Sequence, residues 1–529
     1  MERSRSTNSV LAIFSGFGSE IISKLLLFIS RTIFINFLGA EYLGINGLFT
    51  NILTILSLAD LGIGSAITFY LYKPIANKNK EKIKTLMRFY KHAYTLIGCA
   101  ILILGLAFIP FLHYTVNLST DLNVNLYVIY ILFLLNTVIS YLFFAYKSTI
   151  IFANQKQYLI NVITVIFSVV SCIVESVVII VFKDFTLSLV ARLSVSVIKN
   201  LFISRKADKL YPYLKEKNVI KLKIDEIKRI FKDVYSIFLV KVGAVLATAT
   251  DNLMISVMFG TVYTGFNSNY IMFTALATTL SQQVSGSFRA AVGNIVAEES
   301  KESQYLHFKN LDFINFWVAS VFSVCLFELL NPFITLWIGD SYLFTTVSVA
   351  FIVAHYFIAN MLDVVFVFRE GMGLFKYGRY ANFFAGFVNI CIGIILGKLM
   401  GIPGIFLATV ITDICFSVYV FVHSLFKYGF EIEPRTQFKA ILKYFLVTIF
   451  TCIIVSIVTV WFNQKVSIVL FIIRAIITFI IANLVLVLFY FRTAEFSYAV
   501  NKVILIIKKI SENEKFKNSW LRIFTKHNK

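Results

Sequence analysis

The sequence predicts an all-α membrane protein that crosses the bilayer many times. Of its 529 residues, 58% are hydrophobic and only 15% are charged, whereas soluble domains are roughly 45–50% apolar and about 25% charged. The mean hydropathy is +0.81, and several apolar stretches exceed the roughly 20 residues that a helix needs to cross a bilayer. A membrane β-barrel would instead show short segments of alternating polarity, and the sequence lacks that pattern.

Fourteen apolar segments are expected to be membrane-spanning helices. In chain order they are residues 10–36, 43–70, 93–112, 126–146, 158–182, 185–204, 234–259, 265–288, 311–331, 344–368, 377–397, 402–426, 440–462 and 467–491.

The segments that connect these spans alternate in charge. Of the 49 Lys and Arg residues, 41 fall on one side, three on the other side and five within spans. Because positively charged loops stay in the cytoplasm, we expect both termini to lie inside. The net charge of +21 then reflects this bias together with attraction to anionic membrane lipids. Nucleic acid is not an expected partner.

No catalytic or metal-binding motif accompanies the spans. The six cysteines lie within spans without metal-ligand spacing, so we expect them to pack as small apolar residues. The sequence has no phosphate-binding P-loop. The external loops are short, about a dozen residues at most, which disfavours a glycan-synthesising enzyme with an acidic catalytic loop. The chain is therefore expected to be a transporter rather than an enzyme, without a cofactor other than a coupling ion, Na⁺ or H⁺.

An internal repeat relates the two halves of the chain. "FLGAEYLGINGLFTNIL" (37–53) aligns with "MFGTVYTGFNSNYIMFT" (258–274) at an offset of 221 residues. The aligned pairs are Gly39 with Gly260, Gly44 with Gly265, and Asn46 with Asn267. Two six-helix lobes of equal orientation are a recurrent plan among transporters.

The repeat predicts how the chain is organised. The expected parts are an N-lobe (1–204), a cytoplasmic linker (205–233), a C-lobe (234–426), a terminal helix pair (427–492) and a basic cytoplasmic tail (493–529). Within the linker, the pattern of 213–235 predicts an amphipathic helix on the inner leaflet, whose apolar face would hold Ile220, Ile224, Ile227, Phe231 and Val234.

Three blocks of the chain resemble a known family. "RTIFINFLGAEYLGINGLFTNILTILSLADLGIGSAI" (31–67) looks like the first helical hairpin of Wzx-type polysaccharide flippases, which belong to the multidrug/oligosaccharidyl-lipid/polysaccharide (MOP) exporter superfamily. "ATDNLMISVMFGTVYTGFNSNY" (249–270) and the segment 373–413 are similar to later parts of that family. The resemblance implies two bundles around a central cavity. It also implies an undecaprenyl-pyrophosphate-linked oligosaccharide as cargo, and glycan polymerases or glycosyltransferases as possible partners. It further implies location in the bacterial cytoplasmic membrane, with capsule or exopolysaccharide export as the biological setting.

A stripe of charge marks the first span. Glu20, Lys24 and Arg31 are four and seven residues apart, so they share one face of a helix. Ionised groups in a span usually face the protein interior or a water-filled cavity. At the repeat offset, Glu20 corresponds to Lys241 and Arg31 to Asn252. Both lobe-opening helices are thus expected to carry a polar inner face, and the planar donors of Arg31 suit a phosphate group.

Other polar residues complete the expected site. The substrate-binding candidates are Arg31, Lys24, Glu20, Lys241, Asn252, Gln282 and Arg289, and the candidates for ion coupling are Asp60, Glu175 and Asp251.

Structural alternatives stay open for several of these residues. Glu20 and Lys24 could form an ion pair within one helix, and Glu175 could pair with Arg192 of the next helix. Asp60 could cap a kink, and Arg289 could reach from its helix end to the aqueous interface.

The leading hypothesis is a flippase that moves lipid-linked oligosaccharide by alternating access, with the terminal helix pair holding the polyprenyl tail. A drug/cation antiporter of the same superfamily is the alternative, although such antiporters usually have twelve spans. A non-transporting component of a glycan-assembly complex is the third hypothesis.

Overall fold

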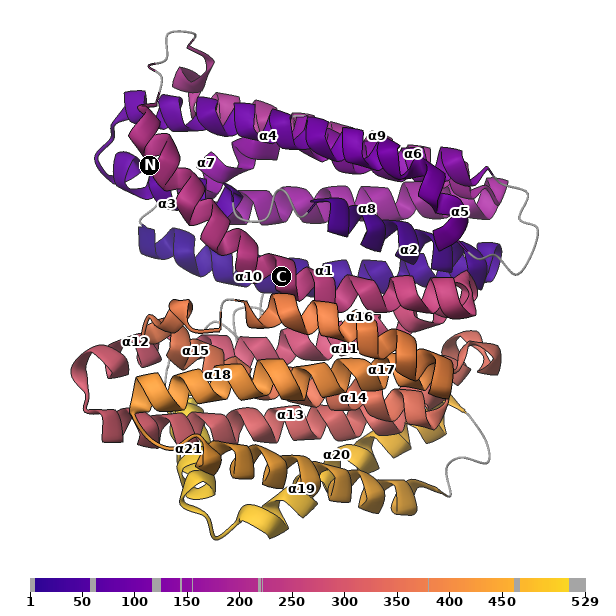
Figure 1. Cartoon of the computed structure of the whole chain (residues 1–529), viewed down its shortest axis with the longest axis vertical. Helices are drawn as coiled ribbons and strands as arrows, with labels where there is room; N and C mark the ends of the chain where they lie inside the picture. The colour runs from indigo at the N-terminus through magenta and orange to yellow at the C-terminus, as the bar shows by residue number, and fades with distance from the viewer. Residues whose placement is uncertain are drawn as a thin grey trace, which may run out of the picture. The chain divides into compact units, whose positions relative to one another are not determined.

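A computed structural model describes most of the chain. It covers residues 5–57, 63–116, 125–142, 145–154, 156–216, 220, 222–378, 380–460 and 467–512. Some side chains within these ranges lie outside the description, chiefly those of residues 5–17 and 239–249. Throughout the described ranges the regular structure is helical, without a strand (Figure 1). The predicted all-α membrane fold is therefore confirmed.

Helices occupy all fourteen places where the sequence predicts a span. Within the described residues, ten helical segments are long and apolar enough to cross a membrane. Three of them join shorter helices: Lys80–Thr115 contains α4 and α5, Thr346–Gly371 contains α14 and α15, and Ile402–Phe430 contains α17 and α18. The other four predicted spans fall on α2 and α3, on α6, on α10 and on α11. Residues 58–62 of the second predicted span lie outside the description.

The chain divides into two compact units. Unit 1 holds residues 1–272, 337–348 and 379–412, and unit 2 holds residues 273–336, 349–378 and 413–529. This partition assigns α10, α16 and α17 to unit 1. The lobes expected from the repeat are a different partition, and they stay a prediction.

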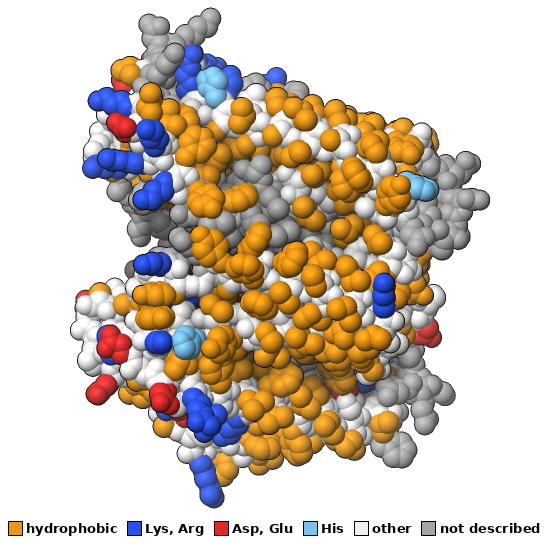
Figure 2. All heavy atoms as spheres, viewed as in Figure 1, with side chains coloured by type: hydrophobic (Ala, Val, Ile, Leu, Met, Phe, Trp, Pro, Cys, Tyr) orange, Lys and Arg blue, Asp and Glu red, His pale blue; other side chains and the backbone are white. Residues whose placement is uncertain are grey.

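Unit 1 is a bundle of helices from both halves of the sequence. Its helices are α1 (Arg5–Leu38), α2 (Ala40–Leu56), α3 (Ile63–Ala76), α4 (Lys80–Phe108), α6 (Leu126–Leu142), α7 (Ser148–Ala153), α8 (Gln157–Phe182), α9 (Phe185–Leu210), α10 (Ile224–Phe259), α16 (Ala381–Met400), α17 (Ile402–Thr412) and the start of α11 (Thr261–Ser287). α1 packs along α8, and α10 packs against α2 and α16. The apolar core centres on fully buried side chains such as Ile45, Phe49, Ile101 and Tyr130. Figure 2 shows hydrophobic side chains over most of the visible face, as expected of a surface in contact with lipid.

Unit 2 is organised around α13 (Lys301–Ile338), a helix of 38 residues. Its other helices are the rest of α11 (residues 273–287), α12 (Arg289–Glu298), α14 (Thr346–Met361), α15 (Asp363–Gly371), α18 (Tyr419–Ser424), α19 (Arg435–Thr459), α20 (Ile468–Tyr490) and α21 (Ala494–Glu512). From α13, the Asn315 amide donates to the Asn360 carbonyl at 2.8 Å, and the Trp317 indole donates to Asn483 of α20 at 2.9 Å. Polar side chains of α13 thus bind both α14 and α20.

The linker differs from its prediction. In place of one amphipathic helix over 213–235, the chain forms a 3₁₀ turn, η4 (Pro212–Lys215), and starts α10 at Ile224. Asp225 and Glu226 lie in the first turn of α10, where carboxylates favour a helix start. The helix then continues into the predicted span without a break, although Ile220, Ile224 and Phe231 remain exposed as the amphipathic pattern requires.

Candidate functional site

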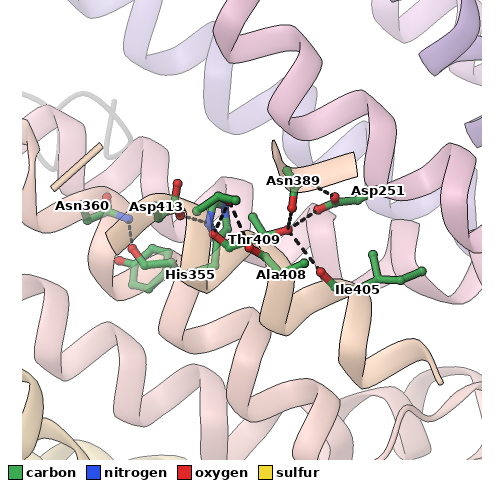
Figure 3. A network of polar contacts seen from close by, with 10 residues as sticks. Asp251, His355, Asn360, Asn389, Ile405, Ala408, Thr409 and Asp413 are labelled. Atoms are coloured by element: carbon green, nitrogen blue, oxygen red, sulfur yellow. Dashed lines mark hydrogen bonds and ion pairs between the residues drawn. The ribbon is translucent and has the colours of Figure 1, made fainter. Parts of the chain in front are cut away.

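Three helices of unit 1 place a carboxylate and two polar partners together. Asp251 lies on α10, Asn389 on α16 and Thr409 on α17 (Figure 3). The Asn389 side-chain amide donates to one carboxylate oxygen of Asp251 at 2.9 Å, and the Thr409 hydroxyl donates to the other at 2.9 Å. Asn389 is 1% exposed and Thr409 5%. We call these three residues the Asp251 site.

Glycines explain how three helices approach closely enough to form this site. A Cβ atom at Gly393 of α16 would lie 2.8 Å from the side chain of Met254, one turn beyond Asp251. A Cβ atom at Gly404 of α17 would lie 2.1 Å from the backbone oxygen of Leu396. Small residues allow such backbone contacts in membrane helices. These two glycines therefore allow α10, α16 and α17 to pack closely, and the Asp251 site lies where the three helices meet.

The Asp251 site has the chemistry of a small-cation or proton site. Besides its carboxylate, it presents the Asn389 side-chain oxygen 3.5 Å from the Thr409 hydroxyl, which itself contacts the Ile405 carbonyl at 3.4 Å. Carboxylate, amide, hydroxyl and carbonyl oxygens are the ligands that hard cations prefer. A carboxylate within a span can also take up and release a proton.

The structure places Arg31 at a crossing of two helical hairpins. Its guanidinium donates to the Ser268 hydroxyl of α11, which in turn donates to the Gly265 carbonyl at 2.6 Å. One residue along, the Thr32 hydroxyl accepts from the Trp337 indole at 2.8 Å. The Nε of Arg31 has no hydrogen-bond partner among the described residues. Arg31 is thus anchored to α11 through Ser268, with its Nε buried.

The crossing beside Arg31 repeats the internal symmetry of the sequence. A Cβ at Gly44 would lie 2.0 Å from the Thr261 carbonyl oxygen, and a Cβ at Gly265 would lie 2.5 Å from the Ala40 carbonyl oxygen. Ala40 corresponds to Thr261 and Gly44 to Gly265 at the offset of 221, so each contact is the counterpart of the other. Such reciprocity is the property of a two-fold contact. The turns that precede both helices also match, because Gly39 and Gly260 have φ angles of 90° and 108°.

Three other charged candidates, Glu20, Lys24 and Glu175, form ion pairs. Lys24 lies 3.4 Å from Glu20, with side chains 29% and 48% exposed, as in the structural alternative. The Glu175 carboxylate accepts from the Arg192 guanidinium at 2.7 Å and is 8% exposed. Arg192 also donates to Asn46 at 3.2 Å. The Glu175–Arg192 pair therefore connects α8, α9 and α2.

Among the described candidates, Asn252 and Arg289 have partners of their own and Gln282 is exposed. Asn252 is buried and accepts from the Asn267 amide at 2.7 Å. In unit 2, Gln282 is exposed, and Arg289 pairs with Glu370 at the surface. Asp60 lies outside the described residues, and so does the side chain of Lys241.

Two polar pairs of unit 2 were not predicted from the sequence. Glu328 of α13 accepts from Arg474 of α20 at 2.9 Å, and the two side chains are 3% and 9% exposed. His355 of α14 contacts the Asp413 carboxylate at 2.6 Å. Glu328 does interrupt the apolar segment 311–331, and that interruption was the available signal.

Comparison with known proteins identifies the class of this fold. The sequence matches no family model and no curated protein. The structure is similar to "Lipid II flippase MurJ, inward closed conformation" (17% identity, TM-score 0.65, 91% of this chain and 99% of that one). It is also similar to an inward-facing multidrug resistance MATE family transporter of the MOP superfamily (15%, 0.64, 79% and 96%), and to the MATE transporter VcmN of Vibrio cholerae (13%, 0.54, 80% and 99%).

The chain is thus a multi-pass membrane protein with a transporter fold. More particularly, that fold is the one found in transporters of the MOP superfamily.

Proposed function

We propose that the protein is a flippase for a lipid-linked, phosphate-bearing oligosaccharide. The observation that carries this proposal is the terminal helix pair, α19 and α20, which is built into unit 2 beside an apolar slot. A transporter for soluble drugs has no need of such a slot, whereas a polyprenyl-linked substrate must keep its tail in an apolar environment while its head group crosses the membrane.

The slot has a volume of about 220 Å³ and lies in unit 2. α20 contributes Phe471 to it, and the rings of Phe333 and Phe471 are 5.7 Å apart. Its wall comes from α11, α13 and α20 and includes Phe273, Leu280, Phe322, Leu326, Phe333 and Phe471. This uniformly apolar lining suits a hydrocarbon chain.

Unit 1 offers matching features for the polar part of such a substrate. Arg31 provides a planar set of donors for phosphate. A second cavity, of about 530 Å³, is lined by Gly64, Thr68, Tyr72, Tyr90, Tyr94, Ser148, Thr149 and Gln157 among others. Hydroxyl and amide groups beside aromatic rings are suited to uncharged sugars, because they supply both hydrogen bonds and apolar faces.

We assign ion coupling to the Asp251 site. A coupling ion must be taken up by a charged group within the spans, and one elementary charge that crosses 100 mV contributes about 2.3 kcal/mol. Both oxygens of Asp251 are held by residues of other helices. Binding of Na⁺ or H⁺ would therefore change the contacts between α10, α16 and α17, which is what coupling to a conformational change requires.

The rival function is drug/cation antiport, as the similarity to MATE transporters suggests. Those structures are matched over 96–99% of their own length but cover only 79–83% of this chain, whereas the flippase MurJ covers 91%. The part that the MATE structures leave uncovered is large enough to contain the terminal pair. This difference favours the flippase.

Depletion of the protein in its host tests the proposal. We expect lipid-linked oligosaccharides to accumulate in the inner leaflet, and re-expression to restore export. The same cells are then challenged with cationic drugs. If drug sensitivity rises while lipid-linked oligosaccharides stay at their normal level, the antiporter replaces the flippase.

A further inference from the structure

A third cavity, separate from the Asp251 site and from Arg31, lies at the Lys- and Arg-rich end of unit 1. It has a volume of about 520 Å³, within the range of about 300–1,000 Å³ typical of small-ligand sites. The start of α4, the 3₁₀ turn η3 (Ala145–Lys147), the end of α9 and the turn η4 form its walls. In Figure 2, one group of Lys and Arg side chains lies at the end of unit 1 where α4 begins.

The lining of this cavity is strongly cationic. Five of its residues are Lys or Arg, namely Lys84, Arg88, Lys91, Lys147 and Lys215, and only Asp208 and Glu216 are acidic. Each of these two carboxylates already has a partner within the cavity wall. The Lys84 ammonium lies 2.7 Å from a carboxylate oxygen of Glu216, and the Lys147 ammonium lies 2.6 Å from a carboxylate oxygen of Asp208. The lining therefore holds three more cationic than acidic side chains.

The inner wall of the cavity is ordered by these pairs. The Lys84 side chain is only 4% exposed and also lies 2.5 Å from Glu81. Lys147 is 13% exposed and donates to the Ser204 hydroxyl at 3.0 Å. Both ammonium groups are thus held in place before a ligand arrives. Arg88 and Lys91, one turn apart on α4, are exposed and complete the rim.

We propose that this cavity binds a phosphate group, as an anionic phospholipid headgroup or a soluble phosphate compound would present it. Phosphate is the anion whose charge and multiple acceptor oxygens match a site of several Lys and one Arg. Basic pockets between membrane helices on the cytoplasmic side are suited to lipid head groups, and this cavity lies on the side that the charge distribution predicts to be cytoplasmic. A bound phosphate would tie α4 to η3, α9 and η4, and so stabilise this end of unit 1.

The test compares two double variants of the full-length protein in detergent micelles. Arg88→Gln with Lys91→Gln removes two exposed rim cations. The matched control, Arg205→Gln with Lys209→Gln, removes one Arg and one Lys that are exposed on α9 and do not line the cavity. Equal thermal midpoints without ligand show that both variants are folded. Binding is then measured by native mass spectrometry and by the shift of the thermal midpoint.

The probes are phosphatidylglycerol, zwitterionic phosphatidylcholine and inorganic pyrophosphate. We expect the rim variant to lose at least about tenfold in affinity for phosphatidylglycerol or pyrophosphate, and the control to bind like the unmodified protein. A response to phosphatidylglycerol alone assigns the site to lipid, and a response to pyrophosphate alone assigns it to a soluble phosphate. Equal losses in both variants, no loss in either, or equally tight binding of phosphatidylcholine overturns the proposal.

Discussion

Glu328 and Arg474 form a buried ion pair 2.9 Å long, although 146 residues separate them in the sequence. The Glu328 carboxylate also accepts from the Thr459 hydroxyl at 3.0 Å and from Ser456, so α13, α19 and α20 meet at this one group. The pair therefore anchors the terminal helices on which the proposed function depends.

Removal of one partner from this pair is expected to be costly, because the other charge stays buried. Arg474→Ala should lower the free energy of unfolding by about 3–5 kcal/mol, measured by thermal unfolding in detergent. The double variant Glu328→Leu with Arg474→Met should recover most of that loss. If the double variant is as unstable as Arg474→Ala, the ion pair itself supplies the stability.

The hairpin crossing of unit 1 should tolerate no side chain at Gly265. Gly265→Ala places a methyl group against the Ala40 backbone oxygen, and overpacking of this kind costs about 1–3 kcal/mol. Gly286→Ala on the same helix is the control, because nothing lies within 4 Å of its Cβ position. We expect a lower thermal midpoint for Gly265→Ala alone. Equal midpoints for the two variants would contradict the close crossing.

Arg31 should be needed for export more than for folding. Arg31→Ala is expected to remain inserted and to block export, and Arg31→Lys to restore export only in part, because an ammonium keeps the charge without the planar donors. Ser268→Ala removes the observed partner of Arg31. If Ser268→Ala abolishes export as completely as Arg31→Ala, then Arg31 acts through the crossing rather than on the substrate.

Neutralisation of Asp251 should uncouple transport from its driving ion. Asp251→Asn preserves the shape of the side chain and removes its charge, so we expect normal expression and a loss of most ion-driven export. Asp340→Asn, in an exposed turn, is the matched control. Export is measured under an imposed Na⁺ or H⁺ gradient, and full gradient dependence in Asp251→Asn would exclude the site from coupling.

Hydropathy and charge were sufficient to predict the fold. Within the described residues, the fourteen apolar segments fall on helices, because the cost of an unpaired backbone in lipid leaves the helix as the available structure for such segments. The repeat was also visible, since only glycine readily adopts the positive φ angles found at Gly39 and Gly260. The end of the linker could not be predicted correctly. The sequence becomes apolar near residue 234, which indicated a boundary between linker and span, but α10 continues through that point from Ile224 to Phe259.

The sequence predicted only part of the candidate site. Asp251 stood out as a carboxylate in an apolar segment, but its partners lie 138 and 158 residues away. Asn389 and Thr409 are ordinary in their own helices and gain a role only when those helices pack. The stripe of Glu20, Lys24 and Arg31 was correctly placed on one helix, yet Glu20 and Lys24 pair with each other, while Arg31 turns to Ser268.

Reconstitution offers the most direct test of the proposed flippase. The purified protein is placed in liposomes with a fluorescent polyprenyl-pyrophosphate-linked oligosaccharide, and an impermeant quencher reports the leaflet that the probe occupies. We predict that the protein moves the probe between leaflets and that Arg31→Ala does so at no more than about the rate of empty liposomes. The account would be contradicted by two results together: the unmodified protein moves the probe no faster than empty liposomes do, and the same vesicles export a cationic drug.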